Sequence, residues 1–123
     1  MSTRKLAVAV LSLRVVYGVA LLIAPERLAR RWLGPDSARS PTQVALRGLG
    51  AREVIVHAAA LVAASRGRSL RGYFAASVLG DLSDVVATVA GQDELPAGSA
   101  KATVLVAGGS ALVTAGVAVL AEL

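Results

Sequence analysis

Two aspartates interrupt one of the most apolar runs of the chain, the segment VLGDLSDVV at residues 78–86. Asp81 and Asp84 are three residues apart, so a helix would place both on one side. Glu53 and His57 are four residues apart and would share a helix face in the same way. Carboxylates and an imidazole are the groups that general acid–base catalysis uses. These four residues are therefore the first candidates for chemistry.

Three arginines lie in the same apolar segments and would balance the three acids: Arg14, Arg47 and Arg52. An aspartate that faces lipid costs at least ~2.5 kcal/mol, so Asp81 and Asp84 are expected to face the protein interior. There they can meet the arginines. The sequence predicts a buried network of opposite charges whose formal sum is zero.

The acids are the candidate catalytic residues: Asp81, Asp84 and Glu53. Burial opposes the charge of a carboxylate and a nearby arginine favours it, so one carboxyl can serve as an acid and another as a base. Tyr17 and His57 could donate hydrogen bonds or relay protons. The candidate substrate-binding residues are Arg14, Arg52, Arg47, His57 and Tyr17.

The composition predicts that these charges belong to a membrane protein. Apolar residues make up 55% of the chain and charged residues 17%, with a mean hydropathy of +0.66. A soluble domain carries about 25% charged residues, so this chain has too little polar surface for water. The chain has no cysteine, which excludes disulfides and thiolate chemistry. Its length predicts one domain over residues 1–123.

Four segments approach the ~20 residues that cross a ~30 Å hydrocarbon core. They run over about residues 5–24, 42–65, 70–90 and 102–120. At ~1.5 Å per residue, Arg14 lies ~13 Å into the first segment. Glu53 and Asp81 lie at similar depths in the next two, so antiparallel neighbours would bring all three together. The expected fold is all-α, a four-helix transmembrane bundle.

A short amphipathic helix is expected between the first two spans, within PERLARRWLGPDSARSP. Leu28, Trp32 and Leu33 can share one face, with arginines on the other side. An apolar face with a tryptophan is typical of a helix that lies at the membrane interface.

The fourth segment carries no charge, and small residues recur in it. Ala107, Ala111 and Ala115 are four residues apart, with glycines beside them. This spacing lets helix backbones approach closely in lipid, although alanine-rich filler would look the same. Neither interpretation gives this helix a catalytic role.

Basic residues cluster between the apolar segments, in STRK, ERLARRW and SRGRSLR, and the formal net charge is +5. Anionic lipid headgroups are the expected partners of such clusters. No nucleic-acid motif accompanies them, so nucleic acid is not expected. Five basic residues fall on each side of the predicted spans, which leaves the orientation undetermined.

The segments LRVVYGVALLIAP, LRGLGAREVIVH and LGDLSDVV resemble the small four-helix membrane proteins of the DoxX-like group, which are common in actinobacteria. The resemblance implies a four-helix bundle in a bacterial inner membrane. It implies no established chemistry.

The expected function is the binding of an amphiphilic small molecule at the buried charges, such as a lipid, a terpenoid or a quinone. Acid–base groups alone suffice for isomerisation, cyclisation or epoxide opening. No motif selects one of these reactions, so the sequence leaves open whether the protein is an enzyme. It indicates no cofactor.

Two other functions stay open. One is a proton- or ion-coupled transporter, formed as a homo-oligomer, in which RGLGAR would break the second span near Gly48 and Gly50. The other is a structural subunit whose charges only fix helix packing.

Two further kinds of site receive less support. A metal site built from the acids and His57 is disfavoured, because three arginines would repel a cation. A Ser-His-Asp triad is nominally available from Ser77 or Ser83, His57 and Asp84, but nothing in the spacing enforces it.

Overall fold

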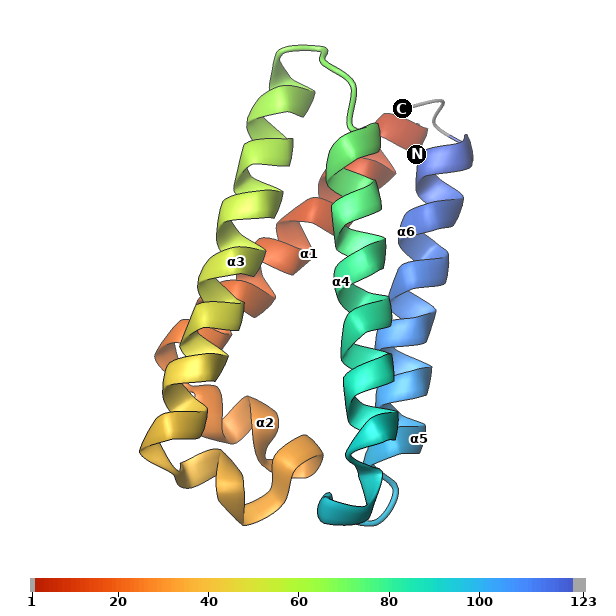
Figure 1. Cartoon of the computed structure of the whole chain (residues 1–123). Helices are drawn as coiled ribbons and strands as arrows, with labels where there is room; N and C mark the ends of the chain where they lie inside the picture. Colours follow the sequence, from red (N-terminus) through yellow and green to blue (C-terminus); the bar gives the residue numbers. More distant parts are fainter. Residues whose placement is uncertain (1, 121–123) are drawn as a thin grey trace.

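A computed structural model describes residues 2–120, and this part of the chain is helical and contains no strand (Figure 1). Four helices are long and apolar enough to cross a membrane: α1 (Thr3–Ile23), α3 (Ser40–Ser65), α4 (Arg71–Ala90) and a continuous helix over Ser99–Leu120. The expected all-α class is therefore confirmed. The largest error in a boundary falls at the start of the fourth helix, which begins at Ser99 instead of near Ala102.

Local sequence explains where the helices begin and end. The Ser2 hydroxyl accepts a hydrogen bond from the Lys5 amide at 3.2 Å and caps α1. Pro25 follows and starts a new helix, and Pro41 lies in the first turn of α3, where its missing N–H has no cost. Gly67, between α3 and α4, has a φ of +66°, a left-handed conformation that glycine adopts readily.

The short helix expected after the first span is present. It is α2 (Pro25–Leu33), and a 3₁₀ turn, η1 (Gly34–Ala38), connects it to α3. A second 3₁₀ turn, η2 (Gln92–Glu94), follows α4. Figure 1 shows α2 and both turns at the end of the molecule opposite the start of α1 and the end of α6.

The fourth long helix is not regular. It consists of α5 (Ser99–Thr103), a π-helical segment η3 (Val104–Gly108) and α6 (Gly109–Leu120). No feature of the sequence predicted the π-helical segment.

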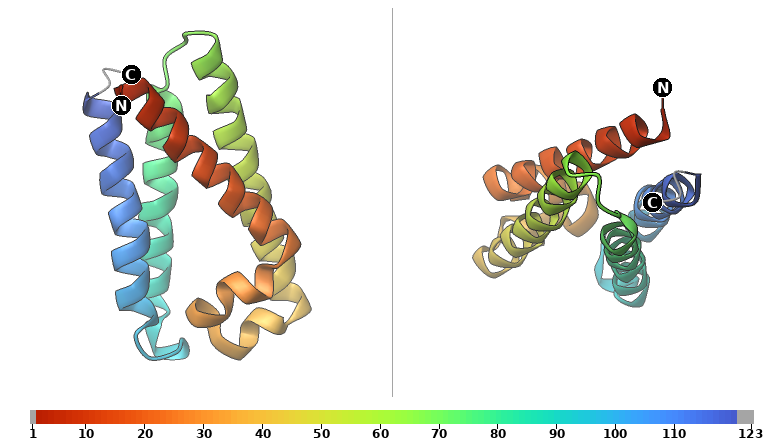
Figure 2. Two further views of the ribbon diagram at one scale, coloured as in Figure 1. Left: turned by 180° about the vertical axis from the view of Figure 1, so that it is seen from behind. Right: turned by 90° about the horizontal axis from the view of Figure 1, so that it is seen from above.

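The long helices pack in pairs, with α1 against α3 and α4 against α6 (Figure 2). Gly18 and Gly50 bring α1 and α3 into backbone contact, because a Cβ atom added to either would lie within 3.0 Å of the other helix. The glycines of the fourth helix do not play this part. A Cβ atom added to Gly108, Gly109 or Gly116 meets nothing within 4 Å, so these glycines make no close helix contact within the described chain.

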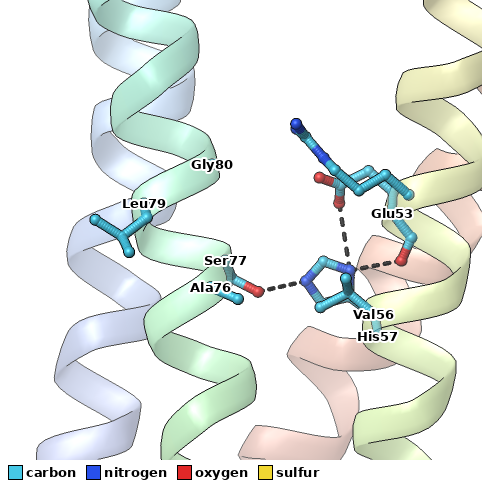
Figure 3. Close-up of a pocket in the computed structure, with 8 residues that line it drawn as sticks. Glu53, Val56, His57, Ala76, Ser77, Leu79 and Gly80 are labelled. Carbon is cyan, nitrogen blue, oxygen red and sulfur yellow. Dashed lines mark hydrogen bonds and ion pairs between the residues drawn. The ribbon is translucent and has the colours of Figure 1, made fainter.

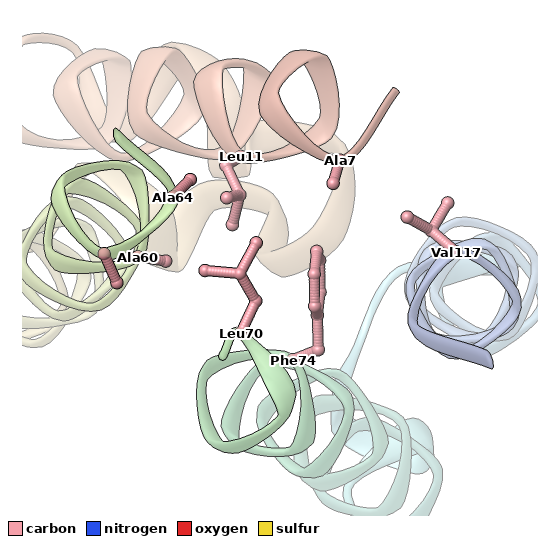
Figure 4. Close-up of a cluster of buried hydrophobic side chains, with 8 residues drawn as sticks. Ala7, Leu11, Ala60, Ala64, Leu70, Phe74 and Val117 are labelled. Atoms are coloured by element: carbon pink, nitrogen blue, oxygen red, sulfur yellow. The ribbon is translucent and has the colours of Figure 1, made fainter. Parts of the chain in front are cut away.

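Buried apolar side chains gather near the start of α1, where the end of α3 and the start of α4 also lie. Figure 4 shows this cluster. Phe74 and Leu70 fill the space between helices, and Leu11 packs from α1. Arg4 donates a hydrogen bond to the Ala64 carbonyl at 3.0 Å and closes this end. The cluster holds the four long helices together beside the buried charges. Its members are Ala7, Leu11, Ala60, Ala63, Ala64, Leu70, Phe74 and Val117.

Candidate functional site

Arg14 of α1 lies at the centre of the buried charges. Its guanidinium donates to both carboxylate oxygens of Glu53 on α3, at 3.0 and 3.2 Å. It also donates to both carboxylate oxygens of Asp81 on α4, each at 2.9 Å. Bidentate geometry of this kind gives the strongest charge-assisted hydrogen bonds. Three sequence-predicted residues from three helices therefore meet in one network.

The fourth long helix also reaches this network. The Nη1 atom of Arg14 donates to the Ser110 hydroxyl at 2.7 Å, so α6 contributes a hydrogen-bond acceptor to the arginine. Ser110 was not among the residues predicted from the sequence, which indicated no catalytic role for its helix. The available signal was a hydroxyl in a charge-free span. Its direction could not be predicted, because small residues surround it on every side.

Arg47 and Arg52 lie outside the network, contrary to the prediction of a balanced set of charges. Arg47 donates to the Leu22 carbonyl at 3.2 Å, and neither arginine forms an ion pair within residues 2–120. Helical rotation explains this. Arg52 is about 100° around α3 from Glu53, and Arg47 is about 120° from it. One guanidinium thus faces two carboxylates.

Asp84 does not join Asp81. Three residues of helix turn its side chain about 60° away and ~4.5 Å along α4. Asp84 forms no ion pair with the described residues, so the expected contact with an arginine is absent there. It lines a separate cavity together with Tyr17. Asp81, Asp84 and Tyr17 were predicted to form one site. In the structure Asp81 belongs to the Arg14 network, and Asp84 and Tyr17 line the separate cavity.

His57 connects α3 to α4 (Figure 3). Its Nδ1 atom lies 2.6 Å from the backbone oxygen of Glu53, and its Nε2 atom lies 2.5 Å from the Ser77 hydroxyl. A carbonyl oxygen only accepts, so Nδ1 carries a hydrogen, and in the neutral imidazole Nε2 accepts from Ser77. The Glu53 carboxylate lies 3.4 Å from Nδ1. The structure therefore pairs Ser77 with His57, and the acid beside them is Glu53 instead of Asp84.

A cavity of about 300 Å³ opens between α3 and α4 beside these groups (Figure 3). Glu53 contributes both to the Arg14 network and to the cavity wall. A molecule in this cavity would therefore meet the carboxylate, the imidazole and the Ser77 hydroxyl. The lining residues are Arg52, Glu53, Val56, His57, Ala76, Ser77, Leu79 and Gly80.

Two alternatives from the sequence can be compared with the geometry. Helix α3 runs unbroken through Gly48 and Gly50. The prediction of a helix break there, which would favour a transporter, is therefore wrong. Among residues 2–120, no three acidic, histidine or cysteine side chains are grouped to hold a metal ion.

No family model, curated protein or solved structure matches the chain. The resemblance to the DoxX-like group thus stays a prediction from three short segments.

Proposed function

We propose that the protein is a multi-pass membrane protein that binds an amphiphilic small molecule in the cavity between α3 and α4, where buried acid–base groups can transfer a proton. The proposal has two parts, the position in a membrane and the chemistry of the cavity. Each has its own support.

The outward side chains support the position in a membrane. Large apolar residues face away from the bundle along all four long helices; Leu112, for example, is 76% exposed and Ile55 is 68% exposed. In water such a surface would be an aggregation liability, whereas lipid solvates it. The four helices would then form a transmembrane bundle and α2 would lie at the interface. The DoxX-like resemblance implies that the membrane is a bacterial inner membrane.

The Arg14 network is the single observation that carries the chemical part. One arginine with two carboxylates leaves a formal charge of −1, unless one carboxyl keeps a proton. Arg52 lines the same cavity but forms no ion pair with a carboxylate of residues 2–120, so the extra charge has no direct counterion there. A charged carboxylate near the middle of a bilayer costs ~2.5–3.5 kcal/mol. A network built only for packing would be better balanced. An excess acid that lines a cavity is suited to give and take a proton.

The cavity wall provides the remaining groups. Ser77 can relay a proton between a bound molecule and Nε2 of His57, giving one proton as it takes another, while the Glu53 carboxylate lies beside Nδ1 on the other side of the ring. Val56 and Leu79 offer apolar surface for a hydrocarbon tail. A lipid, terpenoid or quinone that enters from the bilayer could thus place its polar end at Glu53. Isomerisation, cyclisation or epoxide opening would need no further group.

Cysteine labelling tests this binding. The chain has no cysteine, so Ala76→Cys places a single thiol on the cavity wall. We expect a prenyl alcohol, a short-tailed quinone or a short-chain phospholipid to slow the reaction of this thiol with a maleimide. Ala75→Cys is the matched control, because Ala75 is exposed on the same helix outside the cavity. Unchanged labelling of Ala76→Cys by every probe in this panel would overturn the proposal.

A further inference from the structure

A second cavity, of about 370 Å³, lies between α1, α2, α4 and the start of the fourth long helix. It shares no lining residue with the first cavity. Apolar side chains, among them Leu28 and Val106, form much of its wall. Its polar lining comes from Tyr17, Arg31, Trp32, Asp84, Ser99 and Thr103.

Three of these side chains have no partner in the described chain. Tyr17, Arg31 and Asp84 form no side-chain hydrogen bond or ion pair with residues 2–120. Among the residues of this range that are not exposed, only the Thr114 hydroxyl is both fully buried and without a partner. The carboxylate of Asp84 is therefore not fully buried, and Tyr17 and Arg31 are exposed residues. The charge of Arg52 acts on Asp84 without an ion pair between the two side chains. The hydroxyl, guanidinium and carboxylate at the second cavity can therefore contact a ligand.

The wall of this cavity is held in place. The indole of Trp32 donates to the Thr88 hydroxyl on α4 at 2.9 Å, and the Trp32 carbonyl accepts from the Ser99 hydroxyl at 2.7 Å. Both bonds join α2 to the rest of the bundle. The π-helical segment η3 supplies Val106 and Ala107 to the same wall. Such irregular turns often occur where a helix serves a binding site.

The charges at the cavity select a type of ligand. A simple cation would be attracted to Asp84 and repelled by Arg31, and a simple anion would experience the reverse. Because the two side chains do not pair with each other, a ligand that carries both charges can satisfy both. The aromatic rings of Tyr17 and Trp32 provide surfaces that also suit an ammonium group.

We propose that this cavity binds the headgroup of a phospholipid that carries both a phosphate and an ammonium group. Arg31 binds the phosphate, Asp84 binds the ammonium, and the acyl chains leave past the apolar wall into the bilayer. The position of α2 agrees with this, since it would lie at the level of the headgroups. The proposal rests on the proposed membrane insertion, and it does not depend on acid–base chemistry in the first cavity.

Lipid titration of the purified full-length protein in detergent, followed by native mass spectrometry, tests the proposal. The probes are short-chain phosphatidylethanolamine and short-chain phosphatidylglycerol, which share the phosphate and differ in the ammonium group. We expect the ethanolamine lipid to bind about tenfold more tightly. Asp84→Asn should remove this preference, and Arg31→Gln should weaken binding of both lipids about tenfold.

Matched variants keep the test decisive. Asp93→Asn and Arg30→Gln change exposed residues outside the cavity and should leave both affinities as they are. If Asp84→Asn does not fold, Tyr17→Leu, which removes the aromatic ring beside the same ammonium position, should reduce the preference. Equal binding of the two lipids, or a preference that survives Asp84→Asn, overturns the proposal. Ala76→Cys labelling reads the first cavity alone, so failure of one site can be told from failure of the other.

Discussion

Gly18 of α1 and Gly50 of α3 face each other so closely that a Cβ atom added to Gly18 would lie 2.8 Å from the Gly50 carbonyl oxygen. The reverse substitution would place a Cβ atom 2.7 Å from the Gly18 carbonyl oxygen. Both contacts are with backbone, which cannot rotate away. This crossing brings Arg14 and Glu53, each about one turn from a glycine, into hydrogen-bond distance.

The first prediction concerns this crossing. Gly50→Ala and Gly18→Ala should each destabilise the protein by ~1–3 kcal/mol, because the helices must separate to admit a methyl group. Gly48→Ala is the control, since its added Cβ meets nothing within 4 Å. Thermal unfolding in detergent measures all three. A stable Gly50→Ala protein would show that the two helices do not pack as described.

The second prediction follows from the charge count of the network. Arg14→Met leaves two buried carboxylates without a counterion and should cost ~3–5 kcal/mol. Asp81→Asn leaves Arg14 paired with Glu53, so it should cost clearly less. Unfolding by a denaturing detergent gives both values, with Asp84→Asn as an unpaired control on α4. The network would be misassigned if Asp81→Asn were as damaging as Arg14→Met.

The third prediction concerns the attachment of α2. Thr88→Val removes the hydroxyl that accepts from Trp32 and should cost ~1–3 kcal/mol, because the indole donor is left without a partner. Trp32 is the only tryptophan, so its fluorescence reports directly on its environment. We expect a red-shifted emission in Thr88→Val. Ser83→Ala, at an exposed position of the same helix, should emit as the parent does.

The fourth prediction concerns membrane sidedness. Figure 1 places the N-terminal end of α1 and the 66–70 loop at one end of the bundle, and α2 and the turn after α4 at the other. Single thiols at Ser69→Cys and Asp93→Cys should therefore react with an impermeant maleimide from opposite sides of sealed vesicles. Reaction of both from the same side would contradict the proposed crossing.

Much of the fold could be predicted from the sequence, because apolar runs of spanning length and the prolines that begin helices are local signals. Arg14, Glu53 and Asp81 could also be placed together, since charges in apolar spans must find partners at a common depth. These inferences need only distance along the helix and the cost of isolated charge.

The rest of the site depends on rotation and on contacts between helices. Depth along α3 does not show that Arg52 turns away from Glu53, nor does it show which serine meets His57. Ser110 accepts a hydrogen bond from Arg14, but it is uncharged, so the cost of an isolated charge could not indicate that it has a partner. The backbone contact at Gly50 could not be told from the open glycines of the fourth helix, because small-residue spacing looks alike in both.

The central claim is that the excess acid serves the first cavity instead of only fixing helix packing. Glu53→Gln and Asp81→Asn make the same charge change in one network, and each leaves Arg14 with one carboxylate. Of these two acids, only Glu53 lines the first cavity. Both variants should therefore fold alike, while Glu53→Gln should lose more of its amphiphile binding.

The most direct measurement is the protection of Ala76→Cys from maleimide by a probe amphiphile, compared in these two backgrounds. The account predicts that Glu53→Gln weakens protection about tenfold or more, as expected for the loss of a charge-assisted hydrogen bond, and that Asp81→Asn weakens it less. Equal protection in the parent, Glu53→Gln and Asp81→Asn proteins would contradict it and would identify the charges as structural.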